Sequence, residues 1–436
     1  MLLRIEDTDV ERSKQHHAEQ IVSSLQWLGV EWDEGPVYQS DRLDRYRERA
    51  EELVASGKAY RCYCTVEELE AERNAAETAG QSYRYSGRCR IAAEAGDPQN
   101  PSTTHVIRMK VHPGPIDFHD LIREDVHFEG ELIDDFVLLR SDNNPTYHLS
   151  VVVDDIDMEI THVARGDDHL SNTPKHILLF RAFGADVPVF AHLPLILGSD
   201  RKRLSKRTGA TSAEEYRDMG VLPAALFNFL VLLGWNPGDE REILTPDEAA
   251  AAFDLSDVNK AAAVFDPEKL LWMNGQYMMR MSADELYPHL TPFLGDRVRP
   301  LEELRAMIDL NKTRARTLKD LAELMEPFFL ADDAMVYDAD AVKKHLKGDD
   351  LAAKLTELHD VLAAVEPFDV TTSEAALRAM AESRGVGAGK LIHPLRLALT
   401  GRGASPPIFD VAVVLGKERS LARLRKLIDR LPELMG

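Results

Sequence analysis

A cluster of basic residues near the middle of the chain constrains its fold and chemistry more than any other stretch. From Arg201 to Arg207, five of seven residues are Lys or Arg. The cluster follows an apolar run over 189–197 and precedes a helical pattern over 213–219, which predicts a loop at the carboxyl end of a strand. Such loops bind ligands in open α/β sheets. With the small hydroxyl of Ser205, the loop suits phosphate groups, although charge alone leaves a solvated basic turn as an alternative.

Length and composition indicate a globular protein of several domains. A chain of 436 residues has room for about two to four domains, and 44% hydrophobic with 29% charged residues is ordinary for this class. No apolar run is long enough for a membrane span, and no signal peptide precedes Arg4. The three cysteines suit a reducing compartment. These features predict a cytoplasmic protein without a membrane partner.

The net charge of -22 does not exclude a nucleic-acid partner, because affinity for phosphates depends on local basic patches. Such patches recur after the first cluster, at Arg305, Lys312, Arg314, Arg316 and Lys319, at Lys343, Lys344 and Lys347, and over 417–426. Each of them is also compatible with a solvated helix face.

The N-terminal half shows the alternation of strands and helices that is typical of an α/β fold. An apolar run ends at Glu6 and leads into a helix that Ser13 can cap and Gly29 can end. The valine-rich segment 145–155 is predicted to be a core strand buried on both faces. A further strand over 159–164 leads into 165–169 and then into a helix.

The region beyond about residue 290 has a helical period throughout, without alternating strands. The glycines of 385–390 suggest a phosphate loop, but their spacing does not match one and no buried strand precedes them. That stretch is predicted to be a turn between helices.

The cysteines lie together in the sequence, at Cys62, Cys64 and Cys89, before a strand-like segment over 104–140. Three thiolates and a fourth ligand would form a closed tetrahedral zinc site. Three reduced cysteines without a metal are the alternative.

Five motifs in order give the chain a family resemblance. Residues 203–207, Arg-Leu-Ser-Lys-Arg, resemble the Lys-Met-Ser-Lys-Ser signature of class I aminoacyl-tRNA synthetases. The other motifs are Arg-Ile-Glu-Asp-Thr-Asp at 4–9, Pro-Thr-Tyr at 145–147, Arg-Gly-Asp-Asp-His at 165–169, and the segment 391–401. Together they resemble bacterial glutamyl-tRNA synthetases. The resemblance implies an α/β fold, in which a Rossmann-like catalytic domain carries an α+β insert and precedes an all-α anticodon-binding region.

The resemblance also implies domain boundaries. The catalytic domain would comprise 1–58 and 145–210, with an acceptor-end-binding insert at 59–144. A helical stem-contact domain would follow at 211–290, and the anticodon-binding domain at 291–436. A monomer is expected.

In this family, glutamate is activated with ATP and Mg²⁺ to glutamyl-adenylate and then transferred to tRNA(Glu). The resemblance assigns glutamate binding to Glu6, Tyr147 and Arg165, catalysis to Arg203, Ser205 and Lys206, and ATP binding to Lys206, Leu204, Asp168 and His169. A guanidinium such as that of Arg165 binds a planar carboxylate through two charge-assisted hydrogen bonds, together worth about 1.5–3 kcal/mol. A salt bridge from Arg165 to Asp167 or Asp168 is the alternative.

Two departures from the family pattern affect these expectations. In relatives with a zinc site a histidine stands where this chain has Ile91, and Tyr85 is the candidate fourth ligand beside the cysteines.

Family members also begin earlier, with a strand and a His-Val-Gly-His-like motif that precede the position of Met1. We therefore expect poor ATP binding or an exposed sheet edge. A catalytically silent tRNA-binding protein and a non-discriminating enzyme that also charges tRNA(Gln) are the alternatives.

Overall fold

The computed structural model describes residues 1–436 except 9–14, 82, 98–102, 205–211, 349 and 436. The chain forms two compact units, which are described separately. The N-terminal unit comprises Met1–Thr211 and Leu230–Phe265, and the C-terminal unit comprises Ser212–Phe229 and Asp266–Gly436.

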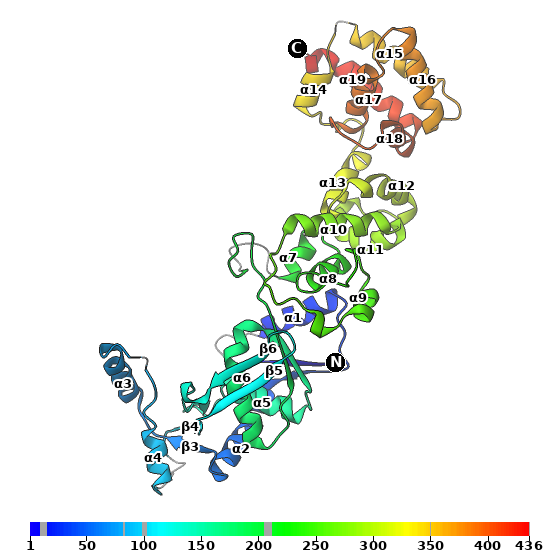
Figure 1. Cartoon of the computed structure of the whole chain (residues 1–436). Coiled ribbons are helices and arrows are strands. Elements are labelled where there is room, and N and C mark those ends of the chain that lie inside the picture. The colour runs from blue at the N-terminus through cyan, green and yellow to red at the C-terminus, as the bar shows by residue number, and fades with distance from the viewer. Residues whose placement is uncertain (9–14, 82, 98–102, 205–211, 349, 436) are drawn as a thin grey trace. The chain divides into compact units, whose positions relative to one another are not determined.

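A four-stranded sheet in the order β6-β5-β9-β8 occupies the centre of the N-terminal unit (Figure 1). Its strands are β6 (Glu124–Glu129), β5 (Pro115–Asp120), β9 (Val189–Leu193) and β8 (His162–Gly166). β8 and β9 are parallel, with Arg165 opposite His192, and β5 joins β9 in parallel at Asp120. Two strands from the segment 59–144 thus belong to the same sheet as β8 and β9. The carboxyl ends of β9 and β8 lie side by side, whereas the carboxyl end of β5 lies beside the start of β9.

β1 (Leu2–Ile5) pairs in parallel with β2 (Glu34–Tyr38) and packs against α1 (Gln15–Trp27). Leu3 and Ile5 are buried, so the alternate positions of β1 face the other way. Gly35, at φ +97°, passes so close to Leu3 that an added Cβ would lie 2.4 Å from the carbonyl oxygen of that residue. This contact requires glycine.

A third sheet has the order β3-β4-β7 and is antiparallel. Its strands are β3 (Ala59–Cys62), β4 (Val106–Met109) and β7 (Val137–Leu139), and its neighbours are α2 (Leu43–Ala55) and α4 (Arg88–Glu94). α3 (Val66–Thr78) begins with a capping box, in which Thr65 and Glu68 bond each other's backbone N–H groups.

The valine-rich segment is a helix, α5 (Tyr147–Asp157), so the predicted core strand is wrong. α5 packs against α2, β7 and α6 (Thr173–Phe183), which bury Leu149, Val152 and Val153 completely. A helix covered on several sides has a near-continuous apolar sequence and cannot be told from a buried strand by hydrophobicity.

The basic cluster begins as a turn. Leu197 and Arg203 form an isolated antiparallel β-bridge, and the Gly198 amide donates to the Lys202 carbonyl over 2.8 Å. Arg201, between them, has a backbone φ of +59°. The predicted loop after the strand is therefore observed up to Leu204. The remainder of the cluster, including Ser205 and Lys206, lies outside the described residues.

Helices make up the described part of the C-terminal unit, as predicted beyond residue 290. They are α7 (Ala213–Asp218), α8 (Pro223–Val231, whose last residues belong to the N-terminal unit), α10 (Pro267–Arg280), α11 (Ala283–Leu294), α12 (Leu301–Asn311), α13 (Leu318–Phe329), α14 (Ala339–His345), α15 (Leu351–Ala363), α16 (Val370–Ser383), α17 (Gly389–Thr400), α18 (Ile408–Leu415) and α19 (Lys417–Met435); α9 (Pro246–Ala252) lies in the N-terminal unit. Leucines from α15, α17 and α19 form the largest part of the core, and Gly385 joins α16 to α17 in the predicted turn. None of the helices among the described residues is long and apolar enough to cross a membrane.

Candidate active site

A cavity of about 500 Å³ lies in the N-terminal unit where β1, α5 and β8 meet. Its lining includes Glu6 after β1, Tyr147 at the start of α5, and Arg165 on β8 with His169 just beyond it. The structure thus brings together four predicted site residues from three separate segments of the sequence. Tyr147, Val151 and Asp155 all line the cavity because positions four apart share one face of a helix.

Arg165 is held in this cavity by uncharged groups. Its Nε donates to His192 Nε2 over 3.2 Å, and its Nη1 lies 3.2 Å from His176 Nδ1 and 3.4 Å from the Tyr147 hydroxyl. Its Nη2 donates to Thr173 Oγ1 over 2.7 Å. Among the described residues, no carboxylate forms an ion pair with Arg165. Its positive charge is therefore available to an anion that enters the cavity.

The alternative of a salt bridge between Arg165 and the following aspartates does not hold in the structure. Asp167 pairs with Arg123 over 2.6 Å, and Asp168 pairs with Arg203 over 3.0 Å. The Asp168–Arg203 pair joins a predicted ATP-binding residue to a predicted catalytic residue. Arg203 is exposed, with 67% of its side-chain surface accessible, and neither it nor Leu204 lines the cavity.

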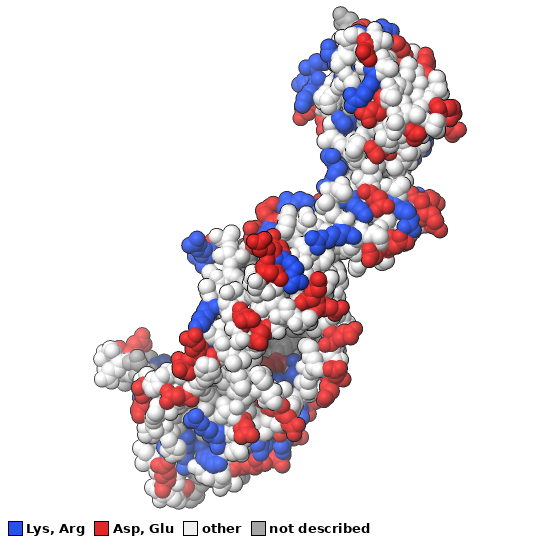
Figure 2. All heavy atoms as spheres, turned by 45° about the vertical axis from the view of Figure 1, so that its right-hand side comes forward, with Lys and Arg blue, Asp and Glu red and all other residues white. Residues whose placement is uncertain are grey.

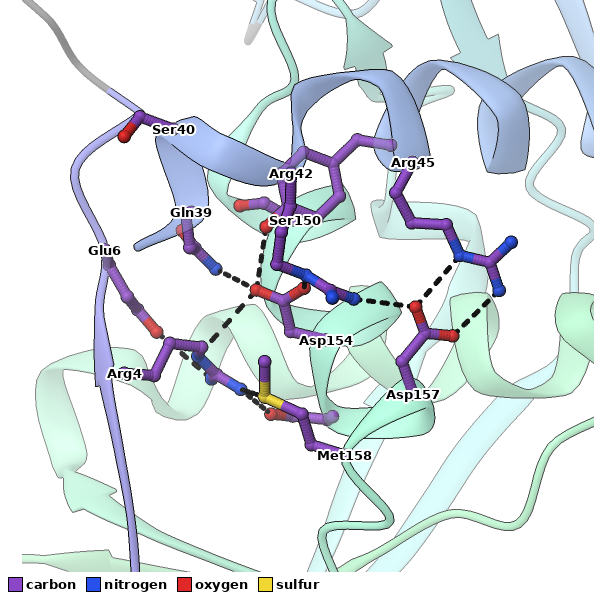
Figure 3. A network of polar contacts seen from close by, with 12 residues as sticks. Arg4, Glu6, Gln39, Ser40, Arg42, Arg45, Ser150, Asp154, Asp157 and Met158 are labelled. Carbon is purple, nitrogen blue, oxygen red and sulfur yellow. Dashed lines mark hydrogen bonds and ion pairs between the residues drawn. The ribbon is translucent and has the colours of Figure 1, made fainter. Parts of the chain in front are cut away.

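Glu6 also lines the cavity and is partly open to solvent, with 41% of its side chain exposed. Arg4 on β1, two residues before Glu6, contacts Glu6 over 3.2 Å (Figure 3). It also contacts Asp155 over 2.8 Å. Burial raises the pKa of Asp155 although Arg4 opposes that shift. Sequence reasoning had not selected Arg4 or Asp155, but the strand alternation around Leu3 and Ile5 places Arg4 beside Glu6.

Tyr147 and His169 are the other two predicted site residues that line the cavity. The Tyr147 hydroxyl lies 3.3 Å from His169 Nδ1, and burial raises the pKa of Tyr147. The phenol is therefore neutral at physiological pH and can both donate and accept a hydrogen bond.

The three cysteines form a separate cluster, with Cys62 at the end of β3, Cys64 just after that strand and Cys89 on α4. Their sulfur atoms lie within 4.8 Å of one another, with Cys64 Sγ 3.5 Å from Cys89 Sγ. The Tyr85 hydroxyl lies 3.3 Å from Cys62 Sγ and 3.5 Å from Cys64 Sγ. Zn–S bonds of about 2.3 Å in a tetrahedron separate two sulfurs by about 3.8 Å, so these donors fit a zinc ion.

Family models cover most of the chain. The catalytic domain of class I tRNA synthetases (E and Q) matches residues 1–272, and an anticodon-binding domain matches 285–428. The chain therefore belongs to the class I tRNA synthetases of the E and Q group, which confirms the predicted family and fold class.

Curated relatives that match nearly the whole chain include glutamate–tRNA ligases. Glutamate–tRNA ligase 2 of Thermoanaerobacter pseudethanolicus is 42% identical, over 98% of this chain and 91% of the relative. Glutamate–tRNA ligase 1 of Acidithiobacillus ferrooxidans is 45% identical, over 98% and 91%. The crystal structure of a glutamate tRNA ligase from Elizabethkingia meningosepticum in complex with its amino acid matches with a TM-score of 0.88 at 34% identity, and the match covers 99% of this chain and 92% of that chain.

Proposed function

We propose that the protein is a glutamate–tRNA ligase, which activates L-glutamate with ATP and transfers it to the 3′ end of tRNA(Glu). The observation that carries this proposal is Arg165, a cation held inside the cavity by neutral groups and facing the same space as Glu6 and Tyr147. Glutamate carries two carboxylates and one ammonium group, and the cavity offers complementary charges for both kinds.

In the proposed complex, Arg165 binds the side-chain carboxylate of glutamate and Glu6 binds its ammonium group. The Tyr147 hydroxyl, which contacts Arg165 and His169, helps to orient the amino acid. The α-carboxylate is then left free to react. Because glutamine lacks the side-chain charge, it forgoes the charge-assisted part of the Arg165 contact, which is worth about 1.5–3 kcal/mol.

ATP would enter as its Mg²⁺ complex. The α-carboxylate of glutamate attacks the α-phosphorus, which gives glutamyl-adenylate and pyrophosphate. Arg203 and Lys206, with Ser205 and Leu204, would bind the phosphates, while Asp168 and His169 lie on the nucleotide side. The Asp168–Arg203 pair supports this assignment because it joins the basic turn to the segment that carries His169. The contribution of these residues is positioning and stabilisation of charge.

In the second step, a hydroxyl of the terminal adenosine of tRNA(Glu) attacks the acyl carbon of glutamyl-adenylate, so that the glutamyl ester forms and AMP is released. Segments 59–144, 211–290 and 291–436 would contact the acceptor end, the stem and the anticodon, respectively. Figure 2 shows small groups of Lys and Arg interspersed with Asp and Glu over the face in view, rather than a uniformly acidic surface. Local basic groups can therefore bind the tRNA backbone despite the net charge of -22.

We further propose that Cys62, Cys64, Cys89 and Tyr85 hold a structural zinc ion. Arg88 supports the site because its Nε lies 3.1 Å from Cys64 Sγ and can offset thiolate charge. Elemental analysis of the purified protein should give one zinc per chain, and a Cys89→Ser variant should lose it. A chain purified without zinc that still folds would contradict this assignment.

The function is tested by glutamate-dependent exchange between ATP and pyrophosphate, with and without tRNA, on the 436-residue chain. Exchange that depends on glutamate and requires tRNA is the expected result. A chain that binds tRNA with steep salt dependence but catalyses no exchange would instead be a tRNA-binding protein.

A further inference from the structure

Three side chains on adjacent strands form a line that ends at the candidate active site. Asp120 ends β5, His192 lies on β9 and Arg165 lies on β8, directly opposite His192. Asp120 Oδ2 lies 2.6 Å from His192 Nδ1, and His192 Nε2 accepts from Arg165 Nε over 3.2 Å. Asp120 and His192 are fully buried, so neither can contact a ligand in the cavity.

Both oxygens of the Asp120 carboxylate have hydrogen-bond partners within the protein. Its Oδ1 accepts from the backbone N–H groups of Ile122, Arg123 and His192, over 3.0, 2.8 and 3.2 Å. Its Oδ2 remains for the imidazole of His192. Burial acts to raise the pKa of Asp120, but these donors together lower it, and burial lowers the pKa of His192. The pair is therefore an ionised carboxylate beside a neutral imidazole.

This pairing determines which nitrogen of His192 carries the proton. A neutral imidazole has one N–H, and the carboxylate requires it at Nδ1. Nε2 is then an acceptor, which matches the Arg165 Nε–H and the Thr173 hydroxyl at 3.0 Å. The opposite tautomer would place two N–H groups against each other at the contact with Arg165.

We propose that Asp120 and His192 are positioning residues that fix the Arg165 guanidinium without neutralising its charge, and so make the site selective for a carboxylate over an amide. The proposal rests on the proposed function, in which Arg165 binds the side-chain carboxylate of glutamate. An aspartate in direct contact with Arg165 would orient it equally well but would compete with the substrate. The imidazole ring keeps that negative charge one side chain away.

The contact on the other side of Arg165 follows the same principle. His176 Nδ1 lies 3.2 Å from Arg165 Nη1, and His176 Nε2 lies 3.2 Å from His148 Nδ1. His176 is buried, with 1% of its surface exposed, and burial beside Arg165 lowers its pKa well below the ordinary value. Two neutral histidines therefore hold the guanidinium from two directions, and Asp120 sets the orientation of one of them.

The decisive variant is Asp120→Asn, because the three backbone donors all bind Oδ1. An amide can keep that oxygen in place and put its NH₂ group where Oδ2 was, which forces the proton of His192 to Nε2. Isothermal titration should then show glutamate binding about tenfold to a hundredfold weaker and glutamine binding almost unchanged. Asp125→Asn is the matched control, since Asp125 on β6 pairs with the exposed His119 on β5, the strand that carries Asp120, and should leave both affinities unchanged.

A second readout is independent of activity. Nitrogen-15 spectra of the histidine side chains should show His192 protonated at Nδ1 in the wild-type chain and at Nε2 in Asp120→Asn. If Asp120→Asn does not fold, His192→Asn replaces it, because that side chain retains a donor for Asp120 while its shorter reach withdraws the acceptor from Arg165. It should cause the same loss of selectivity, with the melting temperature checked in parallel.

Unchanged selectivity between glutamate and glutamine in a folded variant would overturn the proposal, as would a wild-type His192 protonated at Nε2. A wild-type chain that binds no glutamate would overturn the proposed function and with it the role in selectivity. In that case the spectra would still decide whether Asp120 sets the tautomer.

Discussion

Two arginines that line the same cavity have different kinds of partner. Arg4 on β1 is paired with carboxylates, at 2.8 Å from Asp155 and 3.2 Å from Glu6. Arg165 on β8 contacts imidazole, hydroxyl and carbonyl groups instead. An arginine that is neutralised by the protein stabilises the fold, whereas one held by neutral acceptors keeps its charge for a ligand. The comparison predicts that removing the first changes mainly stability and removing the second changes mainly binding.

The largest effect is expected for Arg4→Met. Asp155, with 5% of its side chain exposed, would lose its ion pair, and breaking a buried pair typically costs about 3–5 kcal/mol in free energy of unfolding. Urea denaturation of the N-terminal unit would measure this loss. The double variant Arg4→Met/Asp155→Leu is the control, because it also removes the carboxylate that Arg4→Met would leave unpaired at position 155 and should recover much of the stability. An Arg4→Met protein as stable as the wild type would refute the structural role of Arg4.

Arg165→Gln should have the complementary effect. Loss of the charge-assisted contact should raise the KM for glutamate about tenfold to a hundredfold, while the midpoint of urea denaturation changes little. Pyrophosphate exchange at varied glutamate and varied ATP would separate the two substrates. A large loss of stability with an unchanged KM for glutamate would reverse the comparison.

Acid should weaken the Arg165 side of the cavity through its histidines. Burial, with Lys175 and Arg165 nearby, lowers the pKa of His148 from 6.5 to about 4. The unfolded state therefore binds more protons between those values, so the stability that His148 contributes above pH 6.5 is lost as the pH falls toward 4. At pH 5 the loss is about 2 kcal/mol.

Urea denaturation from pH 7 to pH 5 would measure this dependence in the wild type and in His148→Gln. The variant should show the shallower pH slope. The comparison of slopes isolates His148 from Asp155, whose raised pKa acts with the opposite sign. Identical slopes would show that His148 does not titrate as predicted.

The smallest change in stability is expected for Arg203→Gln. Its pair with Asp168 is exposed, and surface ion pairs contribute about 0–1 kcal/mol. The KM for ATP should nevertheless rise, because the proposed role of Arg203 is to bind phosphate. A thermal melt and pyrophosphate exchange on the same preparation would test both expectations, and a drop in melting temperature without a change in the KM for ATP would count against that role.

Short motifs predicted the family, the fold class and four of the residues that line the cavity, because they carry polar and charged groups whose spacing is specific. Glu6, Tyr147 and Arg165 are far apart in the sequence, and only the folded chain shows that they line one cavity. The roles of Ser205 and Lys206 remain predictions.

Hydrophobicity alone was a weaker guide. It gave a strand where α5 is a helix, since Val152 and Val153 are buried from several directions. Asp120 and His192 were missed because they are 72 residues apart in the sequence, and their relation appears only once β5, β9 and β8 are adjacent.

The last turn of α5 carries Asp154, Asp155 and Asp157, whose negative charges are unfavourable near the negative end of the helix dipole. The three valines that precede this turn favour a strand over a helix. Arg42 and Arg45 bond Asp157, and Arg42 also bonds Asp154 from a position 112 residues away in the sequence (Figure 3). The helix thus has little local preference to form. We expect a free peptide of residues 145–158 to show no helical circular dichroism; a helical spectrum would contradict this. During folding, we expect α5 to become helical only after the segment from β1 to α2 has packed against it. The part of the cavity lining that includes Tyr147 would therefore form late.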